Sequence, residues 1–137
     1  MTPRVLVLSA ILCACASSVA PLEMCRSGMP KATKTCLVDG DTIWVNGVKY
    51  RLEGFDTPEP HTNLCGGRRE RELATAASAS LLDILNTYRW TLHPNGEVDR
   101  YQRGIATIRV NGMDVGDILV EEGLARHWPD GDEWWCE

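Results

Sequence analysis

Five charged side chains lie at the ends of strands that the sequence predicts. They are Asp41, Arg51, Asp56, Glu59 and Arg103. Asp41 opens a hairpin and Asp56 leaves its returning strand, so pairing of the strands would bring both carboxylates to the same end. Two carboxylates on neighbouring strands can hold a hard cation such as Ca2+, with a backbone carbonyl and waters completing its shell. Taken alone, each acidic cluster is more typical of a turn, because Asp is a favoured turn residue.

Two arginines, Arg51 and Arg103, indicate that the bound cation would take part in phosphoryl chemistry. Arg51 lies within a strand, five residues before Asp56 and eight before Glu59. A phosphodiester gains negative charge in its transition state, and Arg donates two parallel hydrogen bonds to such oxygens without losing its charge. The alternative for Arg51 is an ion pair with a structural Glu such as Glu53, on the same face of the strand. Arg103 alone is only a charged loop residue.

A hairpin is expected to position the first acids. Lys34 to Val38 and Thr42 to Val45 read as strands, Asn46-Gly47 is typical of a type I′ turn, and Val48 to Phe55 is the returning strand. The stretch from Asp56 to Gly67 holds two prolines and two glycines, so it is expected to be a loop.

Two helices follow from the apolar spacing. Apolar residues recur in steps of three and four between Leu73 and Leu85, which predicts a helix over Arg68 to Thr87. A shorter helix is expected from Val115 to about Glu122, with Gly123 as its C-terminal stop.

Further short strands are expected at Trp90 to Leu92 and Ile105 to Val110, with a turn at Pro94-Asn95-Gly96. The order of strands, helix, strands and helix predicts an α+β domain, in which helices pack on a small curled antiparallel sheet or barrel.

Four ordered blocks resemble the staphylococcal-nuclease-like (thermonuclease) domain family. They are Val38-Asp39-Gly40-Asp41-Thr42, Arg51-Leu52 with Asp56-Thr57-Pro58-Glu59, Asp99-Arg100-Tyr101-x-Arg103-Gly104-x-Ala106, and Leu119-Val120-x-x-Gly123-Leu124-Ala125. The resemblance covers about Thr35 to Arg126 and rests on the order and gaps of the blocks. It implies a small OB-like five-stranded antiparallel β-barrel with two or three packed helices.

The resemblance also implies a metal site and a catalytic acid. Asp41 and Asp56 would bind one Ca2+ ion, with the main-chain carbonyl of Thr57 as a third ligand. Glu59 would activate or orient the attacking water.

Three arginines and a tyrosine in the matching blocks would bind the substrate. Arg51 and Arg103 would clamp the phosphate and stabilise the charged transition state, and Arg100 and Tyr101 would lie against the terminal phosphate of a bound nucleotide. The activity implied by the resemblance is hydrolysis of DNA and RNA with little sequence preference, leaving 3′-phosphate ends.

Two departures from the family pattern concern these roles. Gln102 stands where the family usually has Gly, which can alter the loop that presents Arg103. The tyrosine-bearing, lysine-rich segment after Gly-Leu-Ala is absent, and three tryptophans follow instead, at positions 128, 134 and 135. They either stack bases in its place or, more commonly for such residues, belong to the core or a lid.

The composition indicates one globular domain of acidic charge. A chain of 137 residues with 44% hydrophobic and 24% charged residues fits a single core and excludes a disordered or fibrous protein. The net charge of -5 opposes non-specific binding to phosphates, so nucleic-acid binding would depend on a local basic patch or a bound cation.

The N-terminal stretch has the pattern of an export signal. Within Met1 to Ala20, an arginine precedes the uncharged apolar run Val5 to Ala16, which is shorter than the roughly 20 residues that a membrane-spanning helix needs. Cleavage is expected after Ala16, or a lipoprotein signal would leave a tether at Cys15. Residues 21–137 would then form a periplasmic or extracellular domain, expected to be a monomer.

The cysteines fit an oxidising compartment. Four lie outside the signal, at positions 25, 36, 65 and 136, and neither a C-x-x-C pair nor a nearby histidine favours zinc. Three pairings are possible and the sequence does not choose among them. We expect Cys25 with Cys36 and Cys65 with Cys136, because the second pair would tie the chain terminus to the body.

Two classes of function remain open at this point. The presence of all five charged side chains favours an active nuclease acting on DNA or RNA. The alternative is a non-catalytic nucleic-acid or protein-binding module of the same fold, although such modules usually lose the charged cluster that is present here.

Overall fold

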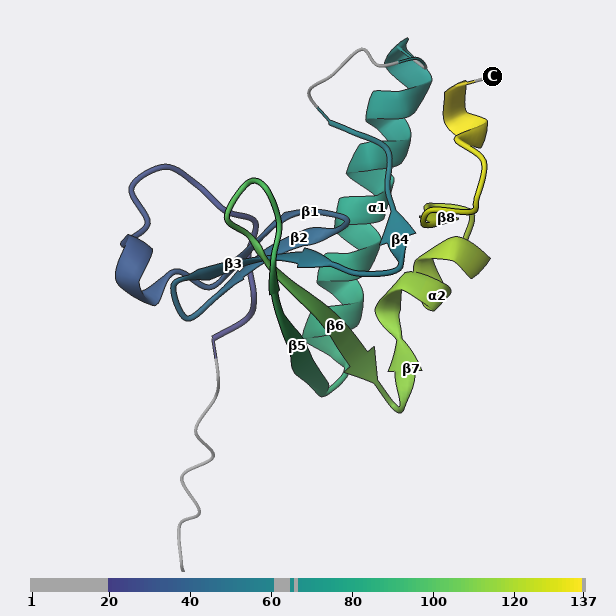
Figure 1. The fold of residues 1–137 in the computed structure, drawn as a ribbon. Coiled ribbons are helices and arrows are strands. Elements are labelled where there is room, and N and C mark those ends of the chain that lie inside the picture. The colour runs from purple at the N-terminus through teal and green to yellow at the C-terminus, as the bar shows by residue number, and fades with distance from the viewer. Residues whose placement is uncertain (1–19, 61–64, 66, 137) are drawn as a thin grey trace, which may run out of the picture.

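The computed structural model describes residues 20–60, 65 and 67–136 (Figure 1). The expected signal, its cleavage site and Cys15 therefore lie outside the described residues, apart from Ala20.

The expected hairpin forms one half of the main sheet. β1 (Cys36–Asp39), β2 (Thr42–Val45) and β3 (Val48–Leu52) pair antiparallel in chain order. Asn46 and Gly47 both have positive φ, at 47° and 82°, as a type I′ turn requires. The register places Thr42 opposite Arg51, so that the start of β2 lies beside the end of β3.

The other half of the sheet joins the hairpin through a parallel pair. β5 (Trp90–Val98) and β7 (Met113–Asp114) both pair antiparallel with β6 (Gly104–Val110). β6 pairs parallel with β3, which corrects the expectation of a purely antiparallel sheet. A parallel pair needs a long crossover, and here the chain between the two strands includes a helix and β5.

The expected α+β, OB-like class is confirmed, with one qualification about closure. Among the described residues, the main sheet has six strands. Five of them run in the order β1-β2-β3-β6-β5, β7 lies beside β6, and these pairings do not close into a ring.

The turn expected at Pro94-Asn95-Gly96 is wrong, because β5 continues through it to Val98. The register between β5 and β6 shifts between Pro94 and Val98, and such an irregularity tolerates a proline that cannot donate to the ladder. The chain reverses later, where the N–H of Asp99 donates to the Arg103 carbonyl at 2.9 Å.

Two helices cover the sheet. α1 (Gly67–Thr87) passes behind β1 and β2 in Figure 1 and buries one apolar face, which includes Ala77, Leu81 and Leu85. α2 (Val115–Glu121) begins after Asp114, whose Oδ1 accepts from the N–H of Gly116, and it ends before Gly123 as expected. The core between these layers contains Leu37, Ile43, Leu52, Phe55, Ile108 and Leu119. Among the described helices, none has the length and apolar character needed to cross a bilayer.

The C-terminal residues, which show no periodicity in the sequence, form a second small sheet. β8 (Arg126–His127) pairs antiparallel with β4 (Phe55–Asp56), and Asp56 lies opposite Arg126. The chain then reaches η2 (Trp134–Cys136), a 3-10 helix beside α1; another, η1 (Lys31–Thr33), precedes β1.

Both expected cysteine pairs are confirmed as disulfides. Cys25 bonds to Cys36 at the start of β1, and Cys65 bonds to Cys136 in η2. The second bond ties the C-terminal segment to the chain just before α1.

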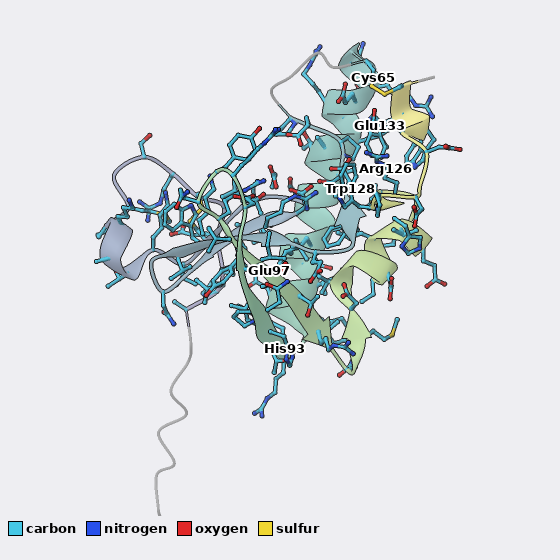
Figure 2. All side chains as sticks on the ribbon, in the orientation of Figure 1. Cys65, His93, Glu97, Arg126, Trp128 and Glu133 are labelled. Atoms are coloured by element: carbon cyan, nitrogen blue, oxygen red, sulfur yellow. A yellow bond between two sulfur atoms is a disulfide. The ribbon has the colours of Figure 1, made fainter. Side chains whose placement is uncertain are left out.

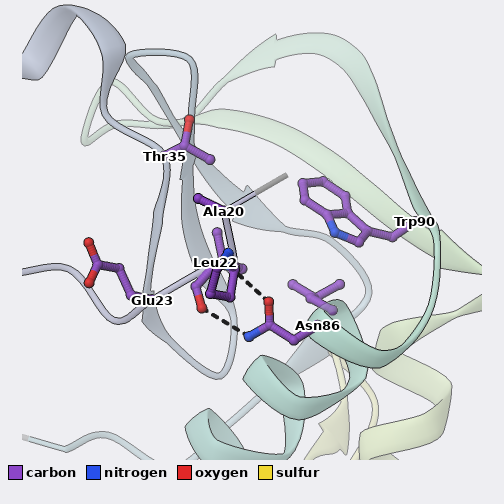
Figure 3. A pocket seen from close by; sticks show the side chains of 8 residues that line it. Ala20, Leu22, Glu23, Thr35, Asn86 and Trp90 are labelled. Carbon is purple, nitrogen blue, oxygen red and sulfur yellow. Dashed lines mark hydrogen bonds between the residues drawn. The ribbon is translucent and has the colours of Figure 1, made fainter. Parts of the chain in front are cut away.

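The first described residues close a pocket at the far end of α1. Asn86 clamps the backbone of Leu22, accepting its N–H at 2.8 Å and donating to its carbonyl at 2.9 Å (Figure 3). The pocket has a volume of about 500 Å³ and its lining includes Glu23 but no lysine or arginine. It is therefore a poor candidate for binding phosphate.

Candidate active site

The turn between β1 and β2 buries Asp41 against Thr57. Asp41 is 4% exposed, and its Oδ2 accepts from the N–H and the hydroxyl of Thr57 at 3.3 and 3.2 Å. Gly40 permits this approach, since a Cβ there would lie 2.8 Å from Cγ2 of Thr57 and 3.1 Å from Cβ of Ala77. A glycine at this position is thus required by space rather than by its φ angle.

Three carboxylates meet beside this turn. Asp41, Asp56 and Glu59 each offer one oxygen, and these oxygens lie within 4.8 Å of one another. Carboxylate oxygens are the ligands that Ca2+ and Mg2+ prefer. The donor set therefore fits a hard divalent cation, and Thr57, the residue expected to lend its carbonyl, is buried within the same segment at 2% exposure.

Arg51 bridges two of these acids. Its Nη1 lies 3.3 Å from Oδ2 of Asp41, and its Nη2 lies 3.4 Å from Oδ1 of Asp56. Nη1 also donates to the carbonyl of Leu52 at 2.7 Å, which fixes the guanidinium in place. The alternative partner, Glu53, instead lies within 3.5 Å of the Asn95 amide. Arg51 thus belongs to the acidic cluster.

Arg103 joins the cluster from the reversal after β5. Its Nε lies 2.7 Å from Oδ2 of Asp99, and its Nη1 lies 3.5 Å from the Thr42 hydroxyl, which in turn donates to Asp41. Gln102 adopts φ of 63°, the left-handed conformation that favours glycine, so the loop keeps the turn despite the substitution.

A pocket beside the acids carries the remaining expected residues. Its volume is about 370 Å³, and Lys49, Glu59, Tyr101 and Arg103 line it. Tyr101 is 63% exposed, and its hydroxyl accepts from Nη2 of Arg100 at 2.7 Å, so both side chains lie at the outer rim. Lys49 was not among the expected residues, although it stands two positions before Arg51 and so on the same strand face.

Burial, together with neighbouring negative charge, raises the pKa values of Asp39, Asp56 and Glu59. Burial raises the pKa of Asp56 and of Glu59, and the charge of Asp41 adds to both, while Arg51 acts in the opposite direction. Burial and the charge of Asp41 raise the pKa of Asp39 to about 7. Like charges held this close repel each other, and a divalent cation relieves that repulsion.

Asp39 and Arg126, like Lys49, are site-related residues that sequence reasoning missed. Asp39 read as a turn residue, since its burial is not visible in the sequence. Arg126 is 9% exposed and its Nε donates to Oδ2 of Asp56 at 3.0 Å, across 70 residues of chain. The only signal for Arg126 was its place directly after the Gly-Leu-Ala block.

The expected site residues therefore divide by position. The acids Asp41, Asp56 and Glu59 lie together with Arg51 and Thr57, Arg103 reaches them through Thr42, and Arg100 and Tyr101 stand at the rim.

Comparison with known proteins gives two findings. A family model described as staphylococcal nuclease homologue matches residues 49–132, a range that contains Arg51, Asp56, Glu59 and Arg103 but not Asp41. The protein named "Succinoglycan biosynthesis protein ExoI", from Rhizobium meliloti, is 34% identical over 98 residues, which cover 70% of this chain and 51% of that protein. The chain thus spans about half the length of this curated relative.

Proposed function

Since the chain belongs to the staphylococcal nuclease family, we propose that it is a Ca2+-dependent nuclease that hydrolyses phosphodiester bonds of DNA and RNA with little sequence preference and leaves 3′-phosphate ends. The observation that carries this proposal is the Asp41, Asp56 and Glu59 cluster with Arg51 laid across it. Three acids alone would suit a structural ion, but an arginine that contacts two of them suits a bound phosphate.

The acids and the backbone of one segment would hold the cation. Asp41 and Asp56 would each supply a carboxylate oxygen, and Thr57 would supply its main-chain carbonyl. The chemistry that a bound Ca2+ contributes here is the neutralisation of charge on a phosphoryl oxygen. Supporting this role, the charges of Asp41 and Asp56 add to the effect of burial in raising the pKa of Glu59, although Arg51 contacts two of the three carboxylates.

Glu59 would take a proton from the attacking water or orient it. A carboxylate whose pKa lies above its ordinary value is a better base near neutral pH, and burial beside Asp41 raises the pKa of Glu59. As the water oxygen bonds to phosphorus, the bond to the 5′ oxygen breaks. The products are a 3′-phosphate and a 5′-hydroxyl, whose proton comes from solvent.

The arginines would stabilise the charge that develops on the phosphoryl oxygens. Arg51 approaches from the cation side, and Arg103 lines the neighbouring pocket with Lys49. Together with Arg100 at the rim, these groups form a local basic surface in a chain of net charge -5. Tyr101, exposed at the same rim, can lie against a nucleotide.

The proposed location of the protein is outside the cytosol. Disulfides persist in oxidising compartments, and the described residues contain two. We propose that the chain is exported to the periplasm or beyond and acts as a monomer.

A non-catalytic binding module of the same fold is the second candidate. The net charge of -5 disfavours non-specific binding to nucleic acid, so it favours the form of this candidate that binds protein. The name of the Rhizobium relative places that protein in succinoglycan biosynthesis, and it does not state a nuclease activity. A binding module would need neither the cation nor the water that Glu59 is proposed to activate.

Digestion of single-stranded DNA by the purified exported chain separates the two candidates. We expect breakdown when Ca2+ is added, arrest by a chelator, and 3′-phosphate groups on the products. Asp41→Asn should abolish the Ca2+ response, whereas Asp117→Asn, which changes an exposed carboxylate on α2, should leave it intact. Intact DNA under all conditions would favour the binding module.

A further inference from the structure

Arg126 stands directly across the small sheet from a proposed metal ligand. The antiparallel pairing of β4 with β8 sets Asp56 opposite Arg126, and residues directly opposite in such a pair have side chains on the same face. The guanidinium is buried, with the Trp128 and Trp135 rings at 5.0 and 5.9 Å from it. This arginine is thus enclosed by the fold rather than directed to solvent.

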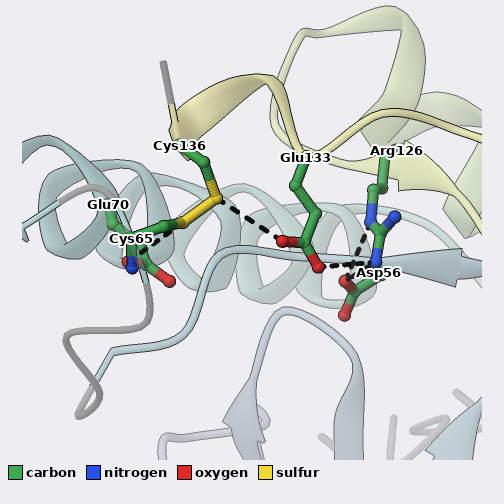
Figure 4. The surroundings of a disulfide bond; sticks show 6 residues. All are labelled: Asp56, Cys65, Glu70, Arg126, Glu133 and Cys136. Atoms are coloured by element: carbon green, nitrogen blue, oxygen red, sulfur yellow. Dashed lines mark hydrogen bonds and ion pairs between the residues drawn. A yellow bond between two sulfur atoms is a disulfide. The ribbon is translucent and has the colours of Figure 1, made fainter.

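Each nitrogen of the Arg126 guanidinium has a partner. Nε donates to Oδ2 of Asp56 at 3.0 Å, and Nη1 donates to the Gly131 carbonyl at 2.7 Å. Nη2 lies 3.0 Å from the same Asp56 oxygen and 2.9 Å from Oε1 of Glu133 (Figure 4). Only the planar fork of an arginine can make all these contacts at once.

These contacts divide the two oxygens of Asp56 between different roles. Oδ2 is held by Arg126, whereas Oδ1 lies on the side of Arg51, at 3.4 Å from its Nη2. The carboxylate is therefore fixed between two guanidinium groups. One oxygen is left to face a cation, so Asp56 would act as a ligand through Oδ1 alone.

The C-terminal segment from Gly131 to Cys136 holds Arg126 in turn. The N–H of Gly131 donates to the His127 carbonyl at 2.9 Å, and a Cβ at Gly131 would lie 2.6 Å from that carbonyl oxygen. Sγ of Cys136 lies 3.4 Å from Oε2 of Glu133, which is a contact and not a hydrogen bond, because a disulfide sulfur carries no proton. Figure 2 shows Cys65, Glu133, Arg126 and Trp128 along one side of the molecule.

We propose that Arg126 is a positioning residue for the metal site, which holds Oδ2 of Asp56 so that Oδ1 is presented to the cation, and that the disulfide-anchored segment keeps Arg126 in place. This inference rests on the proposed function. The arginine does not touch the substrate, and it acts through Asp56. Residues that orient a metal ligand in this way commonly contribute about 10- to 100-fold to metal affinity.

The sign of the effect distinguishes positioning from simple electrostatics. Arg126 is a positive charge close to a proposed cation, so its charge alone disfavours binding. If only the charge mattered, its removal would strengthen Ca2+ binding. If the orientation of Asp56 matters more, its removal weakens Ca2+ binding.

The test is a calorimetric Ca2+ titration of the full exported chain without substrate, with each variant first checked for folding by circular dichroism. We expect Arg126→Ala to bind Ca2+ about 10- to 100-fold more weakly than the wild type. Arg126→Lys should recover only part of the affinity, because an ammonium cannot reach Asp56, Gly131 and Glu133 together. Arg89→Ala, at an exposed position, should match the wild type.

A folded Arg126→Ala chain that binds Ca2+ as tightly as the wild type, or more tightly, would overturn the inference. If that variant does not fold, Glu133→Ala takes its place: it leaves the pair of Arg126 with Asp56 but removes an anchor, and unchanged affinity would contradict the proposal. If the wild type cuts DNA with Ca2+ but the variants bind Ca2+ as tightly as the wild type, the positioning role of Arg126 is wrong and the proposed function still holds. A wild type that binds no Ca2+ would remove both proposals.

Discussion

Asp41 and Thr57, 16 residues apart, are joined by two hydrogen bonds to one carboxylate oxygen of Asp41, at 3.3 and 3.2 Å. This contact ties the β1–β2 turn to the segment that follows β4. It sets Asp41, which precedes β2, beside Asp56 and Glu59, which follow β3 in the chain. The proposed metal site therefore depends on how closely two backbone segments approach.

Gly40→Ala should disturb the site through this approach. The new Cβ would lie 2.8 Å from Cγ2 of Thr57, and we expect a loss of about 1–3 kcal/mol in the free energy of unfolding together with weaker Ca2+ binding. Urea unfolding and calcium titration measure the two effects. Thr57→Ser removes the clashing methyl group, so the double variant should recover part of both losses. Additive losses would contradict a direct clash between these residues.

The stability of the metal-free protein should fall as pH rises from about 4 to about 7. Burial raises the pKa of Asp39 from 3.8 to about 7, so the folded state binds more protons than the unfolded chain in this window, and stability is lost as they dissociate. The raised pKa values of Asp56 and Glu59 act in the same direction.

Melting temperatures in a chelator at several pH values between 4 and 8 measure this effect. Asp39→Asn, which cannot ionise, should melt with a smaller dependence on pH than the wild type. Because Ca2+ competes with protons for the acids, its stabilising effect should be larger at pH 8 than at pH 5. Identical pH profiles for the wild type and Asp39→Asn would exclude Asp39 as the source.

The two disulfides should differ in their influence on the site. Loss of Cys65–Cys136, whose cysteines are 71 residues apart, should cost about 4 kcal/mol of stability by loop entropy and also weaken Ca2+ binding, because Glu133 and Arg126 lose their anchor. Paired Cys→Ala variants, unfolded in urea and titrated with Ca2+, measure both effects. Loss of Cys25–Cys36 serves as the control, with a cost of about 3 kcal/mol and an unchanged Ca2+ affinity. If both variants bind Ca2+ with the same affinity, the proposal that the Cys65–Cys136 bond supports the metal site is wrong.

Tyr101→Ala should raise KM for single-stranded DNA about tenfold and leave kcat unchanged, since stacking on an exposed ring contributes to binding and not to the chemical step. Initial rates at saturating Ca2+ measure both constants. Tyr88→Ala removes another exposed tyrosine, at the end of α1, and should behave as the wild type. A fall in kcat with unchanged KM would instead place Tyr101 close to the reacting phosphate.

Turn residues and apolar spacing predicted the elements whose conformation depends mainly on neighbouring residues in the sequence. Asn46-Gly47 indicated the hairpin because both residues accept positive φ, and Gly123 indicated the end of α2 for the same reason. The helix over Arg68 to Thr87 followed from its apolar spacing and begins one residue earlier in the structure. The site residues were found through the order of the four blocks, since none of the blocks is distinctive alone.

The missed features depend on contacts between distant parts of the chain. β8 is a strand of two residues, too short for any alternation of side chains to be visible. The parallel pairing of β3 with β6 depends on how the chain folds after α1. The irregularity after Pro94 looked like a turn because the same residue types favour both.

The central claim is that a carboxylate in the acidic cluster helps water to cleave a phosphodiester beside a bound cation. Glu59→Gln tests it most directly, in single-turnover hydrolysis of DNA at saturating Ca2+, with the exposed Glu121→Gln as the matched control. The account predicts a rate lowered by about 10²- to 10⁴-fold in Glu59→Gln and a normal rate in Glu121→Gln. A folded Glu59→Gln chain that cuts at the wild-type rate would contradict it.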